Sequence, residues 1–384
     1  MPTTRLRDAR LRAFAIALAA LAPAATASCH TPSEDVDAGD LLGVFSRDGG
    51  VDASDAAAPA RSGRRAGRRG KDGGARASAS ASSGPVETSV RAPIQGACLA
   101  AEGTADRDLK KTIGRPACRD ALVLEWKDAL GSPRYACVFA PKGVDTRAPL
   151  PTVLFFHDGL DDPTMVDKKT SLRKLLGTAD LTGDPAHRGF LVVAVQGRAV
   201  AGGRRGAAFD TAYTGADNVD VAAVDHFLGE VASKGWVDGR RVYALGPSTG
   251  GEMAELYAMM RPDKVAAFGV FAAEPLAAKW ACGGPPPPAA VLYRACDRIV
   301  ACDAVETWLH ARDDGRAETA WARLGDGNDD EPNCAFKHKC GEVKGTANHR
   351  RWPKGKEGFF LKFFAKHALG GGGSAAPAAP AAAE

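Results

Sequence analysis

A serine flanked by glycines is the residue whose setting most clearly predicts chemistry. Segment 246–251 reads Gly-Pro-Ser-Thr-Gly-Gly; it directly follows the apolar run RRVYAL (240–245) and opens a helical stretch at 250–260. A Gly-x-Ser-x-Gly sequence between a strand and a helix makes a tight turn that lifts the serine hydroxyl above the sheet. The pattern predicts Ser248 as a nucleophile. The alternative is a glycine-rich turn with an incidental serine.

A serine hydroxyl is a weak nucleophile, so it needs a general base and an acid that orients the base. In proteins with this strand–turn–helix, the acid and then the histidine follow the serine along the chain. Asp297 comes directly after the apolar run at 289–295 and is the predicted acid, with Asp303 as its rival. His349 is the predicted base, because it follows the strand-like segment 342–348.

Two other histidines compete with His349 for the role of base. His310 falls in the helical stretch 303–312, which indicates a surface residue. His338 lies inside the segment CAFKHKC at 334–340. Because the base must sit in a loop directly after the last strand, His349 is preferred to both; the alternative for it is a surface histidine beside a Trp-Pro corner.

A second turn is expected to supply an anion-binding group. The apolar run at 151–156 ends in His157, Asp158 and Gly159. A tight turn there would aim the Gly159 N–H beside the N–H of Thr249, which begins the helix after the serine, and so form an oxyanion hole. His157 precedes the serine in the chain, so it is expected to hold this loop rather than to act as the base.

Apolar runs of strand length define the elements that must position these residues. The runs are LVLEW (122–126), RYACVFAP (134–141), PTVLFF (151–156), GFLVVAVQ (189–196), RRVYAL (240–245), AFGVFAA (267–273) and AAVLYRA (289–295). The first two flank a Gly-Ser-Pro turn and predict an antiparallel pair. The other five are continuous, which is typical of strands covered on both faces. With helices expected at 219–233 and 250–260, the sequence predicts an α/β fold, a mostly parallel sheet with helices on both faces.

These motifs in combination resemble a known family. The matching segments are 134–141, 150–159, 237–243, 246–251 and 349–353. They resemble the secreted α/β-hydrolase esterases of the polyhydroxybutyrate depolymerase and feruloyl esterase group, and the resemblance covers residues 120–366. It implies an α/β-hydrolase fold and a serine carboxylic ester hydrolase that uses no cofactor and no metal.

The resemblance also assigns site residues. It implies Ser248, Asp297 and His349 as the catalytic residues, and the amides of Gly159 and Thr249 as the oxyanion hole. Two segments depart from the family pattern: its His-Gly loop reads His-Asp-Gly at 157–159, and its glycine-rich stretch before the histidine reads Gly-Thr-Ala-Asn at 345–348.

The connection at 274–288 is too short for a large cap domain. An uncovered cleft suits a bulky or polymeric ester, such as a polyhydroxyalkanoate oligomer or a feruloyl or acetyl sugar ester. Because the oxyanion loop is altered, the alternative is a non-catalytic envelope binding protein that retains the hydrolase fold. A protease of the same fold is disfavoured, since no large N-terminal or cap domain is evident.

The ends of the chain differ in composition from its middle. Residues 1–29 carry four arginines, an apolar run and small residues before Cys29, which predicts an export signal peptide that also resembles a lipoprotein signal. Residues 30–92 and 370–384 predict a disordered linker and a disordered tail, which leaves 93–369 as the hydrolase domain. The protein is therefore expected to be secreted or held at the cell envelope, with a lipid on Cys29 as its membrane contact.

Charge is distributed unevenly along the 384 residues, whose formal net charge is +4. An acidic block at 30–60 and a basic block at 61–76 nearly cancel, so the expected folded part is almost neutral. This balance argues against a nucleic-acid-binding domain. The basic block is interpreted as a solvated linker rather than as a contact for anionic lipid or polysaccharide.

Eight of the nine cysteines lie beyond Cys29, an even number in a protein expected to be exported. We expect them to form disulfides, with Cys334–Cys340 and Cys98–Cys118 as the preferred pairs. A zinc ion held by both of the former cysteines and His338 is the alternative, which an oxidising compartment disfavours.

Overall fold

The computed structural model describes residues 88–92, 94, 96–103, 114–159, 161–199, 207–276, 279–334 and 340–370. The predicted signal peptide, most of the predicted linker and the predicted tail beyond residue 370 lie outside the described residues. Within them, no helix is both long enough and apolar enough to cross a bilayer.

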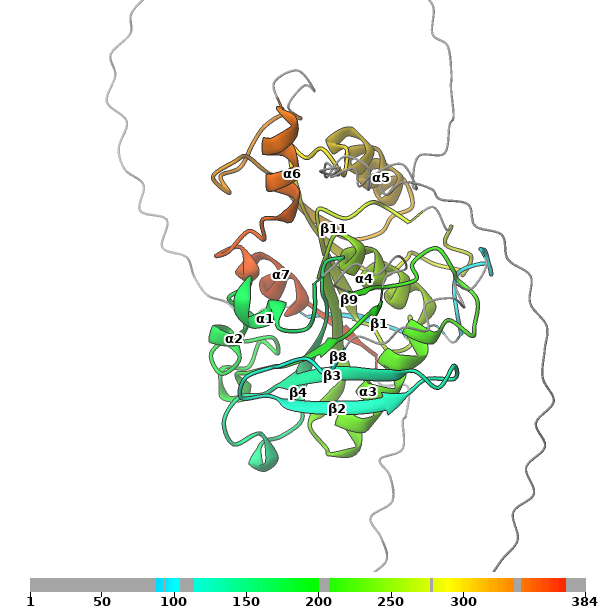
Figure 1. Ribbon diagram of the computed structural model, residues 1–384, viewed down its shortest axis with the longest axis vertical. Coiled ribbons are helices and arrows are strands. Elements are labelled where there is room, and N and C mark those ends of the chain that lie inside the picture. Colours follow the sequence, from blue (N-terminus) through cyan, green and yellow to red (C-terminus); the bar gives the residue numbers. More distant parts are fainter. Residues whose placement is uncertain are drawn as a thin grey trace, which may run out of the picture. The chain divides into compact units, whose positions relative to one another are not determined.

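One eight-stranded sheet forms the centre of the domain (Figure 1). Across the sheet its strands are β11 (Thr319–Leu324), β10 (Ala289–Arg294), β9 (Ala267–Phe271), β8 (Val237–Pro247), β4 (Leu150–Phe156), β5 (Leu191–Val195), β3 (Pro133–Phe139) and β2 (Leu122–Lys127). β3 pairs antiparallel with β2 and β5, and every other neighbouring pair is parallel. The predicted hairpin and the predicted mostly parallel sheet are confirmed.

Helices cover both faces of the sheet, as Figure 1 shows. On one face lie α3 (Val219–Ser233), α4 (Thr249–Met260) and α5 (Cys302–Asp314); on the other lie α1 (Met165–Lys168), α2 (Leu172–Leu175) and α7 (Glu357–Phe364). Along β4, Leu154 and Phe156 belong to the first core and Val153 and Phe155 to the second, and all four are fully buried. Burial on both faces explains why the strand runs are continuously apolar.

The turn from β8 into α4 runs through the Gly-x-Ser-x-Gly sequence, and the sheet on which it stands opens with an antiparallel hairpin. Together these features make the α/β-hydrolase fold. The described part of 272–288, between β9 and β10, contains no named helix or strand. That connection therefore carries no large cap, as expected.

Three local expectations need correction. Segment 342–348 is not a strand, because it lies in α6 (Glu342–Arg350). The last strand of the sheet is β11, whose mixed composition gave no strand signal because an edge strand exposes part of its surface. Within the predicted linker, β1 (Ser89–Arg91) pairs in parallel with β12 (His367–Leu369), so the folded domain begins before residue 93. A three-residue strand is too short to show periodicity.

The remaining short elements lie in the connections. β6 (Arg198–Ala199) pairs antiparallel with β7 (Ala207–Ala208). Single 3-10 turns occur at Val144–Thr146 and Pro185–His187.

All eight cysteines beyond Cys29 form disulfides, which confirms that they pair. The bonds are Cys98–Cys282, Cys118–Cys137, Cys296–Cys340 and Cys302–Cys334. The predicted pairs Cys334–Cys340 and Cys98–Cys118 are wrong, because the fold brings each cysteine to a partner on another segment. Cys334 and Cys340 are both in disulfides, so neither offers a thiolate to the alternative zinc site. His338 lies outside the described residues.

Candidate active site

Ser248 lies at the sharp turn between β8 and α4. Its φ of 48° and ψ of −130° are rare for a residue with a side chain and store backbone strain. Three backbone hydrogen bonds hold the turn. The Ser248 N–H donates to the carbonyl of Phe271 at 2.9 Å, and the carbonyl of Ser248 accepts from the N–H groups of Gly251, at 2.7 Å, and Glu252, at 3.0 Å. The strained turn is therefore anchored to β9 and to α4.

Packing requires glycine on both sides of this serine. A Cβ on Gly246 would lie 2.4 Å from the carbonyl carbon of Gly250, and a Cβ on Gly250 would lie 2.3 Å from the carbonyl oxygen of Phe156. Real Cβ atoms do not approach other atoms this closely, so only glycine lets α4 begin against the end of β4.

His349 connects Ser248 to Asp297. Its Nε2 is 2.9 Å from the Oγ of Ser248, and its Nδ1 is 2.9 Å from the Oδ2 of Asp297. The imidazole side chain is 3% exposed and the carboxylate 2%. A carboxylate only accepts, so Nδ1 carries the proton and Nε2 is free to accept from the serine hydroxyl. The structure thus brings together the three residues that the sequence singled out as nucleophile, base and acid.

Asp297 is held in place by the backbone that follows it. Its Oδ1 accepts from the N–H groups of Ile299, at 2.8 Å, and Val300, at 3.0 Å. These bonds fix the carboxylate so that Oδ2 faces the imidazole. The rival Asp303 is exposed in the first turn of α5, and His310 is exposed on the same helix.

His349 reaches this position from a helix rather than from the expected loop. It lies in the last turn of α6, and two contacts hold that helix against the Asp297 loop. Asn348 donates from Nδ2 to the carbonyl of Cys296 at 3.0 Å, and the Cys296–Cys340 disulfide joins the start of the loop to a residue two positions before the helix.

Gly345 is the second feature of α6 that the site requires. A Cβ there would lie 1.9 Å from the Cγ of Arg298, which follows Asp297 directly. The helix carrying the histidine can therefore approach the acid loop only with glycine at this position.

The loop after β4 is organised by His157, as the sequence predicted. The Nε2 of His157 accepts from the Gly197 N–H at 2.9 Å, so its Nδ1 carries the proton and donates to the carbonyl of Asp158 at 2.7 Å. Burial lowers the pKa of His157, which keeps the ring neutral. A Cβ on Gly159 would lie 3.3 Å from the Oγ1 of Thr249, so the two residues predicted for the oxyanion hole are neighbours. The role of their amides stays a prediction.

Two carboxyl groups beside the serine have no counterpart in the sequence-based site. Burial raises the pKa of Asp158, while the charge of His349 and a hydrogen bond with Ser248 lower it. Burial likewise raises the pKa of Glu252, in the first turn of α4, to about 7. A hydrogen bond from Thr211 Oγ1 at 2.7 Å acts in the opposite direction and lowers this pKa. Asp158 stood out as a departure from a family pattern, but no motif indicates Glu252.

No protein-family model matches this chain, and no curated protein matches it. Among solved structures, a thermostable esterase is similar at 16% identity and a TM-score of 0.41, over 65% of this chain and 63% of that one. The propionate-bound esterase Est2 of Thermogutta terrifontis is similar at 14% identity and a TM-score of 0.42, over 55% of this chain and 85% of that one. An esterase of Pyrobaculum calidifontis is similar at 17% identity and a TM-score of 0.41, over 55% of this chain and 77% of that one. This chain therefore spans somewhat less than two thirds of the first of these structures.

Proposed function

We propose that the protein is a serine carboxylic ester hydrolase in which Ser248, His349 and Asp297 form a catalytic triad. The observation that carries the proposal is the hydrogen-bond chain from the serine hydroxyl through the imidazole to the buried carboxylate. Such a chain activates a hydroxyl that is otherwise a weak nucleophile.

In this mechanism the Ser248 Oγ attacks the ester carbonyl while Nε2 of His349 takes the hydroxyl proton. Asp297 keeps the imidazole in the required tautomer and stabilises its cation. The amides of Gly159 and Thr249 bind the oxyanion, and each such donor contributes roughly 3 kcal/mol to the transition state. His349 then protonates the leaving alcohol and activates the water that hydrolyses the acyl-enzyme.

The proposed substrate is an ester outside the cytoplasm, such as a polyhydroxyalkanoate oligomer or a feruloyl or acetyl sugar ester. Its support is the motif resemblance around 150–159 and 349–353, together with the short connection between β9 and β10. Neither nucleic acid nor a protein-bound metal or cofactor enters the proposal.

Export belongs to the same proposal. Four disulfides are typical of proteins in oxidising compartments. Residues 1–29 would direct export, Cys29 would carry a lipid anchor, and the segment from residue 30 would be the tether to the hydrolase domain. Mass spectrometry of the native N-terminus tests this: an acylated Cys29 supports it, and an unprocessed Met1 contradicts it.

The activity is tested with 4-nitrophenyl butyrate and with a fluorophosphonate probe. We expect the probe to label Ser248, and Ser248→Ala and His349→Ala each to remove nearly all turnover. Because the residues act as one unit, the double variant should lose little more than either single variant. The carboxyl group of Asp158 beside the nucleophile favours the alternative, a non-catalytic envelope binding protein. Absence of both labelling and turnover in the folded protein would support that alternative.

The acid is tested by a matched pair of substitutions. Asp297→Asn removes the charge that orients and stabilises the imidazole, so we expect a loss on the order of 10³-fold or more in kcat. Asp303→Asn, on an exposed carboxylate that follows closely in the chain, should leave kcat close to wild type. Equal losses in both variants, measured on the same ester, would show that the acid is assigned wrongly.

A further inference from the structure

Arg294, the last residue of β10, is fully buried. Its side chain belongs to a residue that is 1% exposed, and it lies three positions before Asp297 in the chain. A charged group is costly to bury unless it is paired or well hydrogen-bonded. The contacts of this guanidinium show what offsets that cost.

The guanidinium of Arg294 donates hydrogen bonds to two segments that are distant in the chain. Nη1 donates to the carbonyl of Gly325, just after β11, at 2.7 Å. Nη2 donates to the Oδ1 of Asn328 at 2.7 Å and to the carbonyl of Arg351 at 3.0 Å. All three acceptors are neutral, and among the residues that the structure describes no carboxylate forms an ion pair with Arg294.

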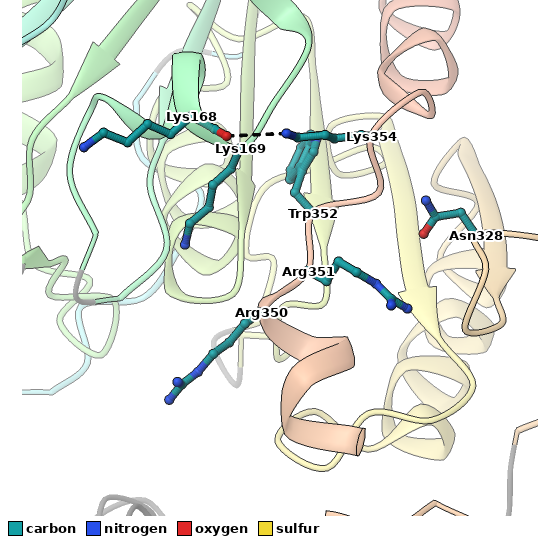
Figure 2. Close-up of a pocket in the computed structure, with 7 residues that line it drawn as sticks. All are labelled: Lys168, Lys169, Asn328, Arg350, Arg351, Trp352 and Lys354. Atoms are coloured by element: carbon teal, nitrogen blue, oxygen red, sulfur yellow. Dashed lines mark hydrogen bonds between the residues drawn. The ribbon is translucent and has the colours of Figure 1, made fainter. Parts of the chain in front are cut away.

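A second group of contacts joins the loop after β11 to the end of α6. Asn348 donates from Nδ2 to the Oδ1 of Asp326 at 2.8 Å. The guanidinium of Arg351 donates to the carbonyl of Asp326, and to the Oδ1 of Asn348 at 2.9 Å. Figure 2 shows the Arg351 side chain extending toward the side on which Asn328 lies. Arg294 and the end of α6 thus hold the same loop.

A further contact links Arg294 to the serine turn. Its guanidinium carbon is 5.5 Å from the centre of the Phe271 ring, which is within the range of cation–π attraction. The carbonyl of Phe271 accepts the hydrogen bond from the N–H of Ser248 at 2.9 Å. Arg294 therefore contacts the residue that anchors the nucleophile, ends the strand that leads to the acid, and bonds to the backbone two residues beyond the base.

The positive charge of Arg294 also acts on the site. Burial lowers its pKa to about 10, and the charge of Arg351 lowers it further, whereas the charges of Asp297 and Asp326 raise it. The side chain is therefore a cation at neutral pH. The carboxylate of the proposed triad is one of the two negative charges that stabilise it, without a direct hydrogen bond.

The charges that act on the imidazole of His349 differ in sign. Asp297 is hydrogen-bonded to the ring, and Asp158 and Glu252 interact with it electrostatically, so these acids favour the imidazolium. The arginines nearest in the chain are exposed to screening water: Arg298, Arg350 and Arg351. The buried charge of Arg294 is not screened in this way; it favours the ionised carboxylate and opposes a second positive charge on the ring.

We propose that Arg294 is a positioning residue of the catalytic site. Its hydrogen bonds fix the segment that follows His349 relative to the Asp297 loop, and its charge keeps the imidazole unprotonated to lower pH. A purely structural side chain would perform only the first of these roles. This inference rests on the proposed triad, and no motif in the sequence indicates Arg294.

Two variants separate the hydrogen bonds of Arg294 from its charge. Arg294→Lys keeps the charge but loses the planar fork of donors, and Arg294→Met loses both. We expect each to lower kcat on 4-nitrophenyl butyrate by about tenfold or more with little change in KM, because the triad is displaced. Only Arg294→Met should also move the acid limb of the kcat/KM profile to higher pH, by about half a unit or more, because the imidazole then takes up a proton more easily.

Arg312→Met is the matched control. Arg312 is 6% exposed, its guanidinium carbon is 5.2 Å from the centre of the Phe268 ring in β9, and its Nη2 donates to the carbonyl of Pro287 at 2.7 Å. Pro287 precedes β10, at the far end of that strand from Asp297. Arg312→Met should therefore lower stability without moving the acid limb.

Arg294→Gln, which removes the charge but keeps an amide donor, preserves the test if methionine prevents folding. An acid limb that is unmoved in Arg294→Met and in Arg294→Gln would overturn the proposal. A limb moved equally by Arg312→Met would overturn it as well, because the shift would then follow from lost stability.

NMR titration of the His349 ring in Ser248→Ala separates this inference from the proposed function, because it needs no turnover. Adding Arg294→Met to this variant should raise the pH at which the ring takes up a proton, whereas adding Arg312→Met should not. A raised midpoint in a protein whose wild type hydrolyses no ester would contradict the esterase proposal and leave the electrostatic role of Arg294 standing. Ester hydrolysis by wild type with an unmoved midpoint would do the reverse.

Discussion

Asp158 places a carboxyl group next to Ser248 in a loop that is otherwise expected to present backbone N–H groups to the substrate. Burial raises its pKa, so a protonated fraction persists to higher pH than for an ordinary aspartate. The ionised form would face the developing oxyanion, and like charges at close range in a partly buried site repel by a few kcal/mol, on the order of 2–4. This residue is therefore expected to limit the reaction as pH rises.

We predict that Asp158→Asn raises kcat on a neutral ester at about pH 8 by several-fold. The amide has no charge and adds a donor, whereas the aspartate loses its proton as pH rises, so the gain should grow with rising pH. The full pH profile of both proteins checks this. A variant slower than wild type across the range would show that Asp158 assists the reaction, and Asp303→Asn controls for the general effect of removing a carboxylate.

The turn between β8 and α4 depends on close packing of the start of α4 against the end of β4. A Cβ on Gly250 would lie 2.3 Å from the carbonyl oxygen of Phe156, at the end of β4. Any side chain at this position must push α4 away from the sheet, and the helix carries the first N–H groups proposed to bind the oxyanion. The packing of one helix therefore determines both stability and the expected catalytic geometry.

We predict that Gly250→Ala destabilises the protein by roughly 1–3 kcal/mol or more and removes most of the esterase activity. Gly229→Ala in α3 is the matched control, because a Cβ there meets no atom within 4 Å and alanine is the better helix former. That variant should unfold at equal or higher denaturant concentration than wild type. Equal behaviour of the two variants would contradict the packing argument.

The Cys296–Cys340 disulfide joins the loop of Asp297 to the start of α6, which carries His349. The two cysteines are separated by 44 residues, so cross-linking them removes much freedom from the unfolded chain. The bond also constrains the distance between the proposed acid and the proposed base.

We predict that replacing both Cys296 and Cys340 by serine lowers stability by roughly 2–4 kcal/mol and also lowers kcat. Removing the Cys118–Cys137 bond, which reaches β3 rather than the acid loop, should lower stability with little change in kcat. Denaturant unfolding and initial rates, measured on the same samples, distinguish the two effects. A retained kcat in the first double variant would show that the helix is positioned without the bond.

Buried carboxyl groups make the folding stability of the whole molecule depend on pH. Burial raises the pKa of Glu252 and that of Glu255 to about 7 from a usual value of 4.5. The folded state then holds protons that the unfolded state has already released, so stability falls as pH rises from about 4.5 to about 7. Above that range the loss from these groups is complete.

We predict that Glu252→Gln flattens this part of the stability profile. At about pH 8 the variant should exceed wild type by up to about 3 kcal/mol, because it no longer buries a charge, and the gain should shrink at about pH 5. Unfolding at both pH values measures it, with the exposed Glu125→Gln as the control. A gain at pH 5 as large as that at pH 8 would show that the effect is not one of ionisation.

Sequence alone determined the features that neighbouring residues encode. Seven apolar runs predicted the hairpin and the parallel strands, because burial on both faces leaves a local record in composition. The glycines around Ser248 predicted the turn, since a Gly-x-Ser-x-Gly sequence between a strand and a helix is a local pattern. Asp297 was predicted as the acid because it comes just after a strand-length apolar run.

Tertiary structure decided what depends on segments far apart in the chain. It selected the disulfide partners, placed His349 on a helix rather than in a loop, and added β11 and β1 to sheets at positions where composition gave no signal. It also turned Asp158 toward the serine. These features arise from contacts between distant residues, and no local pattern of residue types records which distant residues will meet.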